Sequence, residues 1–147
     1  MRSLLRSTLL AALVTAALSL SVLTSAPASA ATTLERALVV KINASRAAHG
    51  LRALPNRRYL ATKARAHSAA MARRNRLYHS DLSRICCFRR VGENVAVNYT
   101  IRRVHRSLMR SPGHRANILG RYWHGVGVGV VKARGKLWVT EIFRQHR

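Results

Sequence analysis

The residues of this sequence best suited to chemistry lie in the stretch 92–119. Glu93 opens this stretch and is one of only four acidic residues in the 147-residue chain, and His114 lies near its end within the letters SPGHRANIL. An imidazole and a carboxylate that face one cleft can hold a divalent metal such as Zn²⁺, bind a small ligand, or form a purely structural hydrogen-bonded cluster. We expect the functional site here if both ends of the stretch face the same cleft.

A short helix is expected to position His114. Ser111 is a good N-cap, Pro112 suits the first helical position, and Gly120 can end the helix in the left-handed conformation. The predicted helix runs from Pro112 to Leu119, with His114 in its first turn, where the helix dipole disfavours the imidazolium and keeps a ring nitrogen free. Ser111 is better explained as the cap of this helix than as a nucleophile.

Three further helices are predicted from apolar periodicity and stop signals. The first begins at residue 32 or 33 and ends at Gly50, the second spans about 58–75 with Asn56 as its cap, and the third spans 101–110 with Thr100 as its cap. The inward positions are expected to be Leu60, Ala64, His67 or Ser68, and Met71 in the second helix, and Ile101, Val104 and Leu108 in the third.

The end of the chain is strand-like. Valines alternate with glycines over 125–130, so one face of this strand is apolar and the other is bare enough for close backbone approach. A turn is predicted over 133–136, and the strand 137–143 that follows carries apolar side chains on both faces. Such a strand is expected to be covered by helices on both sides.

These motifs together resemble the bacterial branch of the CAP superfamily, also called SCP or cysteine-rich secretory protein, antigen 5 and pathogenesis-related-1. The resemblance rests on GEN, then SPGHRANIL, then HGVGVGV, and it extends outward to INASRAAHGLRAL, YLATKARAHSAAMARRNRLYHSDL and LWVTEIF. It covers nearly all of the chain after residue 31. It implies an α/β fold: a three-layer α-β-α sandwich with a small, mostly antiparallel central sheet.

The resemblance also implies a cleft with two histidines and two acidic residues. His79, Glu93 and His114 match three of these positions, and the position of the second carboxylate is Ser111. On its own, a histidine beside a helix end, as His79 is, indicates a cap or a surface group. The match predicts a ligand-binding cleft of His79, Glu93, Ser111 and His114, in which His79, His114 and Glu93 are the candidate metal ligands.

Three functions are consistent with such a cleft. The first is a CAP domain that binds a divalent metal or a small, lipid-like ligand without turnover, and the second is a metal-assisted hydrolase. The third is a cationic module that binds anionic cell-wall polymers or nucleic acid. The sequence contains no nucleophile elbow, H-E-x-x-H motif or phosphate-cradling loop. We therefore assign no catalytic residue, and a structural network in which Glu93 holds His114 stays an alternative.

The charge balance bears on the third function. Lys and Arg number 27 against four Asp and Glu, for a formal net charge of +23. Such a field attracts anionic polymers and acidic lipid headgroups. However, the basic residues are spread along the whole chain rather than gathered into one run with aromatics, which is also what biased composition and a solvated surface would produce.

Residues 1–30 have the pattern of a secretory signal peptide. Arg2 and Arg6 form a basic start, an apolar run follows, and the letters ASA ending at Ala30 form a cleavage signal. A membrane anchor is the competing interpretation, but the apolar run of about sixteen residues is short for a span. We predict cleavage after Ala30, export from the cell, and a single domain over 31–147.

Cys86 and Cys87 are adjacent in a chain expected to be exported. A disulfide between neighbours closes a strained ring, and neighbouring side chains diverge too much for a metal site. We expect a pair of thiols or a strained bridge in a loop, open to bonding between molecules.

Overall fold

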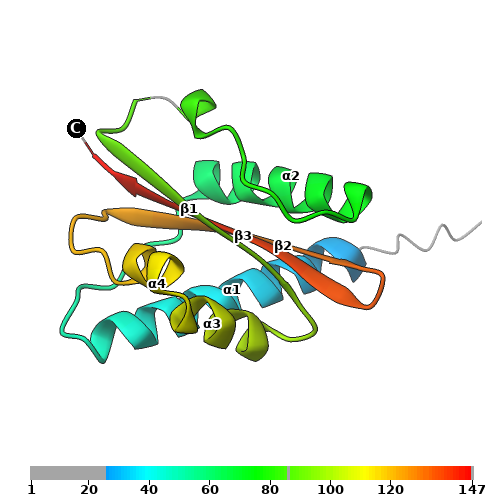
Figure 1. Cartoon of the computed structure of the whole chain (residues 1–147), viewed down its shortest axis with the longest axis horizontal. Helices are drawn as coiled ribbons and strands as arrows, with labels where there is room; N and C mark the ends of the chain where they lie inside the picture. Colours follow the sequence, from blue (N-terminus) through cyan, green and yellow to red (C-terminus); the bar gives the residue numbers. More distant parts are fainter. Residues whose placement is uncertain (1–25, 86, 147) are drawn as a thin grey trace, which may run out of the picture.

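A three-stranded sheet forms the middle of the protein in the computed structural model, which describes residues 26–85 and 87–146 (Figure 1). The strand order is β1 (Arg90–Asn98), β3 (Lys136–Gln145), β2 (Gly125–Ala133), and both pairings are antiparallel. Arg134 and Gly135 join β2 to β3 with φ values of 51° and 70°. Two successive positive φ values suit a tight hairpin, so the predicted turn over 133–136 is confirmed.

Helices cover both faces of this sheet (Figure 1). The helix α2 (Arg58–Arg74) lies on one face, and α1 (Ala26–Ala47), α3 (Ile101–Arg110) and α4 (Pro112–Ile118) lie on the other. A short 3₁₀ helix, η1 (Leu82–Arg84), precedes β1. The predicted three-layer sandwich is therefore confirmed.

The apolar core is divided by the sheet. On the side of α1, α3 and α4, the strand β3 contributes Leu137, Val139 and Phe143 to one large cluster. On the side of α2, it contributes Ile142 and Trp138 to two smaller clusters. These sets alternate along β3 as the sequence predicted, and burial of both faces explains why neither face of this strand is polar.

Two glycines of β2 let α2 approach closely. A Cβ atom added at Gly127 would clash with the backbone of Leu60, and one added at Gly129 would clash with the backbone of Ala64 and Arg65. The valines between these glycines point the other way, into the large cluster. The predicted bare face is thus the face against which α2 packs.

The first two helices differ in detail from the predicted ones. The helix α1 begins at residue 26, earlier than expected, and ends at residue 47, before Gly50 with its φ of 65°. The predicted cap at Asn56 is wrong, because Asn56 forms an isolated bridge with Val126 and the N-cap position falls to Arg57, whose side chain makes no capping bond. The predicted end of α2 is confirmed by Asn75, which adopts the left-handed conformation.

The caps of α3 and α4 show one confirmed and one wrong prediction. Thr100 Oγ1 accepts a hydrogen bond from the Arg103 N–H at 3.2 Å, as expected of the N-cap of α3. Gly120, however, has no positive φ, and α4 ends through Leu119 instead. The Trp123 indole packs directly against Gly120, where an added Cβ would lie 2.5 Å from Trp123 Nε1. Gly120 is therefore needed for this contact and not for a left-handed turn.

Most of the predicted signal peptide falls on residues 1–25, outside the described residues. The leader and its cleavage after Ala30 therefore stay predictions. Within 26–85 and 87–146, no helix is long and apolar enough to cross a membrane.

Candidate functional site

Glu93 is the residue to which the other groups in this part of the site are hydrogen-bonded. The strand β1 buries it to 5% exposure, below the segment that links α2 to η1. Glu93 Oε1 accepts hydrogen bonds from the Ser80 N–H at 2.9 Å and from His79 Nδ1 at 2.8 Å, and Oε2 accepts a short one from Ser80 Oγ. Both carboxylate oxygens are thus engaged, and the two residues above Glu93 are held in place by it.

This arrangement fixes the tautomer of His79. Because Glu93 accepts the bond, His79 Nδ1 carries a proton, so Nε2 is the nitrogen that offers a lone pair when the ring is neutral. The His79 side chain is 61% exposed, and no partner of its Nε2 is recorded in the described part of the chain. An oriented imidazole with an available Nε2 is what a metal ion or a hydrogen-bond donor on a ligand requires.

His114 lies in the first turn of α4, as predicted, and its Nδ1 is 2.9 Å from Ser111 Oγ. Burial, and after it the charge of His79, lower the pKa of His114, so the imidazole is neutral at neutral pH. Ser111 occupies the predicted N-cap position of α4, but its side chain makes no bond to the helix amides and lies beside the His114 ring instead. Ser111 therefore belongs to the site as a partner of His114.

The structure brings the predicted residues together unequally. His79 and Glu93 are in direct contact, and His114 is close enough for the charge of His79 to affect its pKa. Over 26–85 and 87–146, however, no three His, Cys, Asp or Glu side chains are grouped so that they could hold a metal ion. Both Glu93 oxygens already accept hydrogen bonds. The groups that remain to coordinate a metal ion are therefore the imidazoles of His79 and His114.

A pocket opens beside His79. Its volume is about 420 Å³, and its wall combines polar groups such as Ser80 with the apolar surfaces of Tyr78, Ile85 and Ile142. His67, one of two alternatives predicted for an inward position of the second helix, also lines it, and its Nε2 lies 2.8 Å from the Tyr78 carbonyl oxygen. His67 thus positions the segment that carries His79, and the pocket has room for a small organic ligand.

A buried polar network behind β1 was not predicted. Asn94 Nδ2 donates to the His114 carbonyl oxygen at 3.1 Å and to Glu141 Oε2 at 3.0 Å. Asn117 Nδ2 donates to the Glu93 carbonyl oxygen at 3.2 Å and to Asn94 Oδ1 at 2.9 Å. The signal in the sequence was Glu141 itself, a carboxylate on an otherwise apolar face of a strand expected to be covered.

Glu141 is fully buried in this network. Its Oε1 has no hydrogen-bond partner among the described residues. Burial raises the pKa of the Glu141 carboxyl to about 7, against a smaller lowering by the bond from Asn94. A second carboxyl therefore does lie behind the site, although not at Ser111, where the resemblance placed its counterpart.

Only one of the two adjacent cysteines is among the described residues. Cys87 is exposed and has a φ of 75°, whereas Cys86 lies outside the described residues. The state of the pair stays a prediction.

Comparison with known proteins gives consistent results. The family model described as "CAP: Cysteine-rich secretory protein family" matches residues 39–143. The uncharacterized protein YkwD of Bacillus subtilis (strain 168) is 33% identical over 129 residues, which cover 80% of this chain and 49% of that protein. The chain thus spans about half the length of this curated relative.

Two solved structures are informative. An extracellular protein containing a SCP domain from Bacillus anthracis str. Ames superposes with a TM-score of 0.70 at 25% identity, covering 78% of this chain and 41% of that one. The structure of NaASP2 with Zn²⁺ has a TM-score of 0.61 at 10% identity, covering 75% of this chain and 78% of that one. The second likeness shows the fold alone.

Proposed function

The chain belongs to the cysteine-rich secretory protein (CAP) family, and from this premise we propose that it is an exported binding domain whose cleft holds a divalent ion between His79 and His114. Glu93 serves in this proposal as the group that orients His79, not as a ligand. The observation that carries the proposal is the Glu93–Ser80–His79 cluster, which leaves His79 Nε2 as an available acceptor on an exposed ring.

The donor set fits a weak, open site. Two neutral imidazoles suit Zn²⁺, and a carboxylate that accepts the other ring N–H is the usual partner of a metal-binding histidine. For His114 to take part through Nε2, its Nδ1–H must donate to Ser111 Oγ, which is within reach at 2.9 Å. Coordination positions on the ion that no protein group fills would be open to water or to a small ligand in the adjoining pocket.

Turnover is not part of the proposal. A metal-assisted hydrolase needs a general base near the bound water. Glu93 already accepts three hydrogen bonds, and Glu141 is enclosed behind the sheet. Binding without reaction is therefore the function that the described residues support best.

Titration calorimetry with Zn²⁺ at neutral pH tests the proposal. We expect His79→Ala and His114→Ala to weaken binding by about tenfold or more, and Glu93→Gln, which loosens the orientation of His79, by about 10- to 100-fold. Binding should weaken as pH falls through the histidine range near 6.5, because protons compete for the imidazoles. Lower salt should weaken it too, because the formal charge of +23 is then less screened.

His146→Ala is a matched control. His124 and His146 stack with ring centroids 5.5 Å apart, and this second histidine pair shares no residue with the cleft. Loss of Zn²⁺ binding in His146→Ala, with normal binding in His79→Ala and His114→Ala, would contradict the proposal.

Export is the second half of the proposal. It is supported by the basic and apolar pattern of residues 1–30 and by the description of the Bacillus anthracis relative as extracellular.

A further inference from the structure

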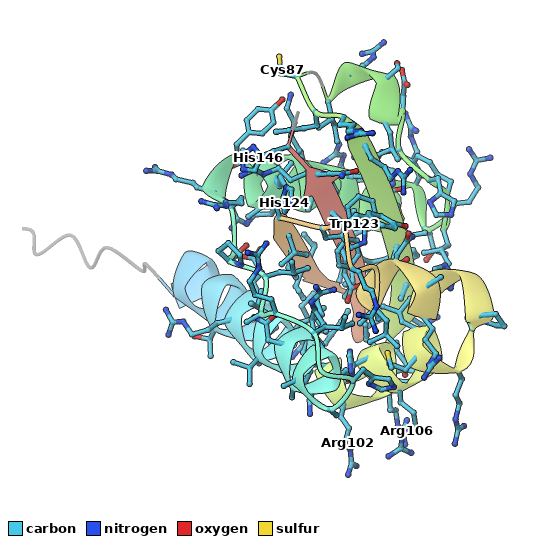
Figure 2. All side chains as sticks on the ribbon, turned by 90° about the vertical axis from the view of Figure 1, so that its left-hand side faces the viewer. Cys87, Arg102, Arg106, Trp123, His124 and His146 are labelled. Carbon is cyan, nitrogen blue, oxygen red and sulfur yellow. The ribbon has the colours of Figure 1, made fainter. Side chains whose placement is uncertain are left out.

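A second pocket lies between the loop that precedes α2 and the ends of β2 and β3. It has a volume of about 450 Å³ and is lined by Arg52, Ala53, Leu54, Pro55, Arg57, His124 and His146. Figure 2 shows His124 and His146 beside each other at this end of the sheet, and Arg102 and Arg106 on α3 apart from them, at the bottom of the view. No residue lines both this pocket and the one beside His79.

Two arginines, Arg52 and Arg57, line the pocket and Arg144 lies beside Arg57, whereas no acidic side chain is among the described lining residues. Gly125 lies below two of them, since a Cβ added there would meet Arg57 Cγ at 2.8 Å and Arg144 Nε at 3.4 Å. Burial, and after it the charge of Arg57, lower the pKa of Arg144. The Arg144 guanidinium is in turn held over the Phe88 ring, 4.9 Å from its centroid. The fold thus keeps like charges together at this place.

The four acidic side chains of the chain are all engaged elsewhere. Glu35 pairs with Arg65, and Asp81 pairs with Arg84. Glu93 pairs with His79, and Glu141 is buried behind the sheet, bonded to Asn94. No acidic side chain of this protein is therefore left to neutralise the arginines of the pocket.

Toward a ligand, His124 and His146 offer hydrogen-bond donors and not acceptors. Arg144 Nη1 lies 2.7 Å from His146 Nδ1, and because a guanidinium can only donate, this nitrogen must accept. The His146 backbone N–H donates to His124 Nδ1 at 3.1 Å, so that nitrogen accepts as well. In each neutral ring the proton is therefore on Nε2, the atom that remains for a ligand.

The nearby carbonyl oxygens are largely occupied. The carbonyls of Arg52, Leu54, Pro55 and Arg57 each accept a hydrogen bond from within the protein. The side-chain polar groups that line the pocket are thus two guanidinium groups and two imidazole N–H groups. These side chains offer a cation only positive charge and donors, whereas a tetrahedral oxyanion matches both the charge and the fork geometry of arginine.

We propose that this pocket is a binding site for a phosphate group, carried on a small organic molecule that packs against the exposed side chains of Ala53 and Pro55. The volume exceeds that of a bare phosphate ion, and the apolar part of the wall gives the organic group a surface to contact. The site is independent of the metal cleft. It gives the positive charge of the chain a specific location at which an anionic ligand is recognised.

Calorimetry on the full chain in chloride buffer at constant ionic strength tests the site, with inorganic phosphate and glycerol 3-phosphate as separate probes. Tighter binding of glycerol 3-phosphate would show that the organic group is recognised, and equal binding would show that the phosphate group alone is. We expect Arg52→Gln/Arg57→Gln to weaken both probes by about tenfold or more. Both arginines are exposed, so the variant should fold normally.

Arg102→Gln/Arg106→Gln is the matched control, because it removes the same charge from exposed positions on α3 (Figure 2). It should change phosphate affinity by less than about twofold. An equal loss in both double variants would overturn the proposal, since it would show attraction by the overall field only.

Histidine side-chain NMR gives a second readout. Saturable shifts of the His124 and His146 Nε2 resonances on adding phosphate support the site, and their absence overturns it. Sulfate keeps its charge between pH 6.5 and 8, and its binding should persist over this range because Arg52, Arg57 and Arg144 stay charged. Zn²⁺ binding should be unchanged in Arg52→Gln/Arg57→Gln, which separates this proposal from that of the metal cleft.

Discussion

Replacement of Glu141 by Gln should stabilise the protein increasingly as pH rises. Glu141 lies in the middle of the sheet, opposite Asn94 on β1 and Val128 on β2, and its side chain is fully buried. Gln has nearly the same shape and can still accept the hydrogen bond from Asn94 Nδ2. It carries no charge at any pH, so the cost of burying a carboxylate is removed.

The magnitude follows from proton linkage. Burial raises the Glu141 pKa from 4.5 to about 7. Between these two values the folded protein binds a proton that the unfolded chain does not, so stability falls as pH rises. At about 1.36 kcal/mol per pKa unit, the loss above pH 7 amounts to about 3 kcal/mol. The advantage of Glu141→Gln should be near zero at pH 4.5 and approach this value at pH 8.

Urea unfolding of wild type and Glu141→Gln at several pH values measures this advantage. Using the difference between the two proteins cancels other titrations, such as those of His105 and His114, whose pKa values burial lowers. Asp81→Asn is the control, because its exposed carboxyl has a pKa lowered by bonds from Ser83 and should give a constant difference between pH 5 and 8. A constant difference for Glu141→Gln over pH 4.5–8 would refute the reasoning.

Three other predictions concern packing, the cysteines and export. Gly129→Ala should lower the free energy of unfolding by about 1–3 kcal/mol in urea titrations, because its Cβ would displace the backbone of α2; no loss would mean that α2 is not seated on this strand. A double Cys86→Ser/Cys87→Ser variant should melt close to wild type, since a bridge between neighbours closes almost no loop, whereas a loss of about 3 kcal/mol would indicate pairing between chains. The intact mass of exported protein should correspond to a chain beginning at Ala31, and retention of Arg2 would show that the apolar segment is an anchor.

The layered fold was predictable because burial leaves a periodic trace in sequence. The alternation of valine and glycine in β2 and the apolar character of both faces of β3 indicated a covered sheet, and the spacing from Leu60 to Met71 indicated the buried face of α2. Helix ends were less predictable, since tertiary contacts decided them. Gly120 has the residue type of a helix stop, yet Trp123 explains its presence.

The site was predictable only in part. His79 alone would have been taken for a surface group, and the family resemblance was needed to pair it with Glu93. Ser111 has the predicted N-cap position, but its hydroxyl lies beside the His114 ring and makes no bond to the helix amides. Sequence spacing cannot rank these two local partners. The pocket proposed to bind phosphate could not be predicted from the sequence, because residues near 52–57, 124 and 144–146 come together only when the sheet forms.

The position of β3 has a consequence for how the molecule is made. The central strand is the last of the three in the chain, so β1 and β2 have no partner until residues 136–145 emerge from the ribosome or a translocation channel. Contacts of such long sequence separation delay formation of the sheet until residues 136–145 are available to pair. The same topology makes the sheet sensitive to proteolysis, because removal of β3 (Lys136–Gln145) takes away the shared neighbour of both other strands.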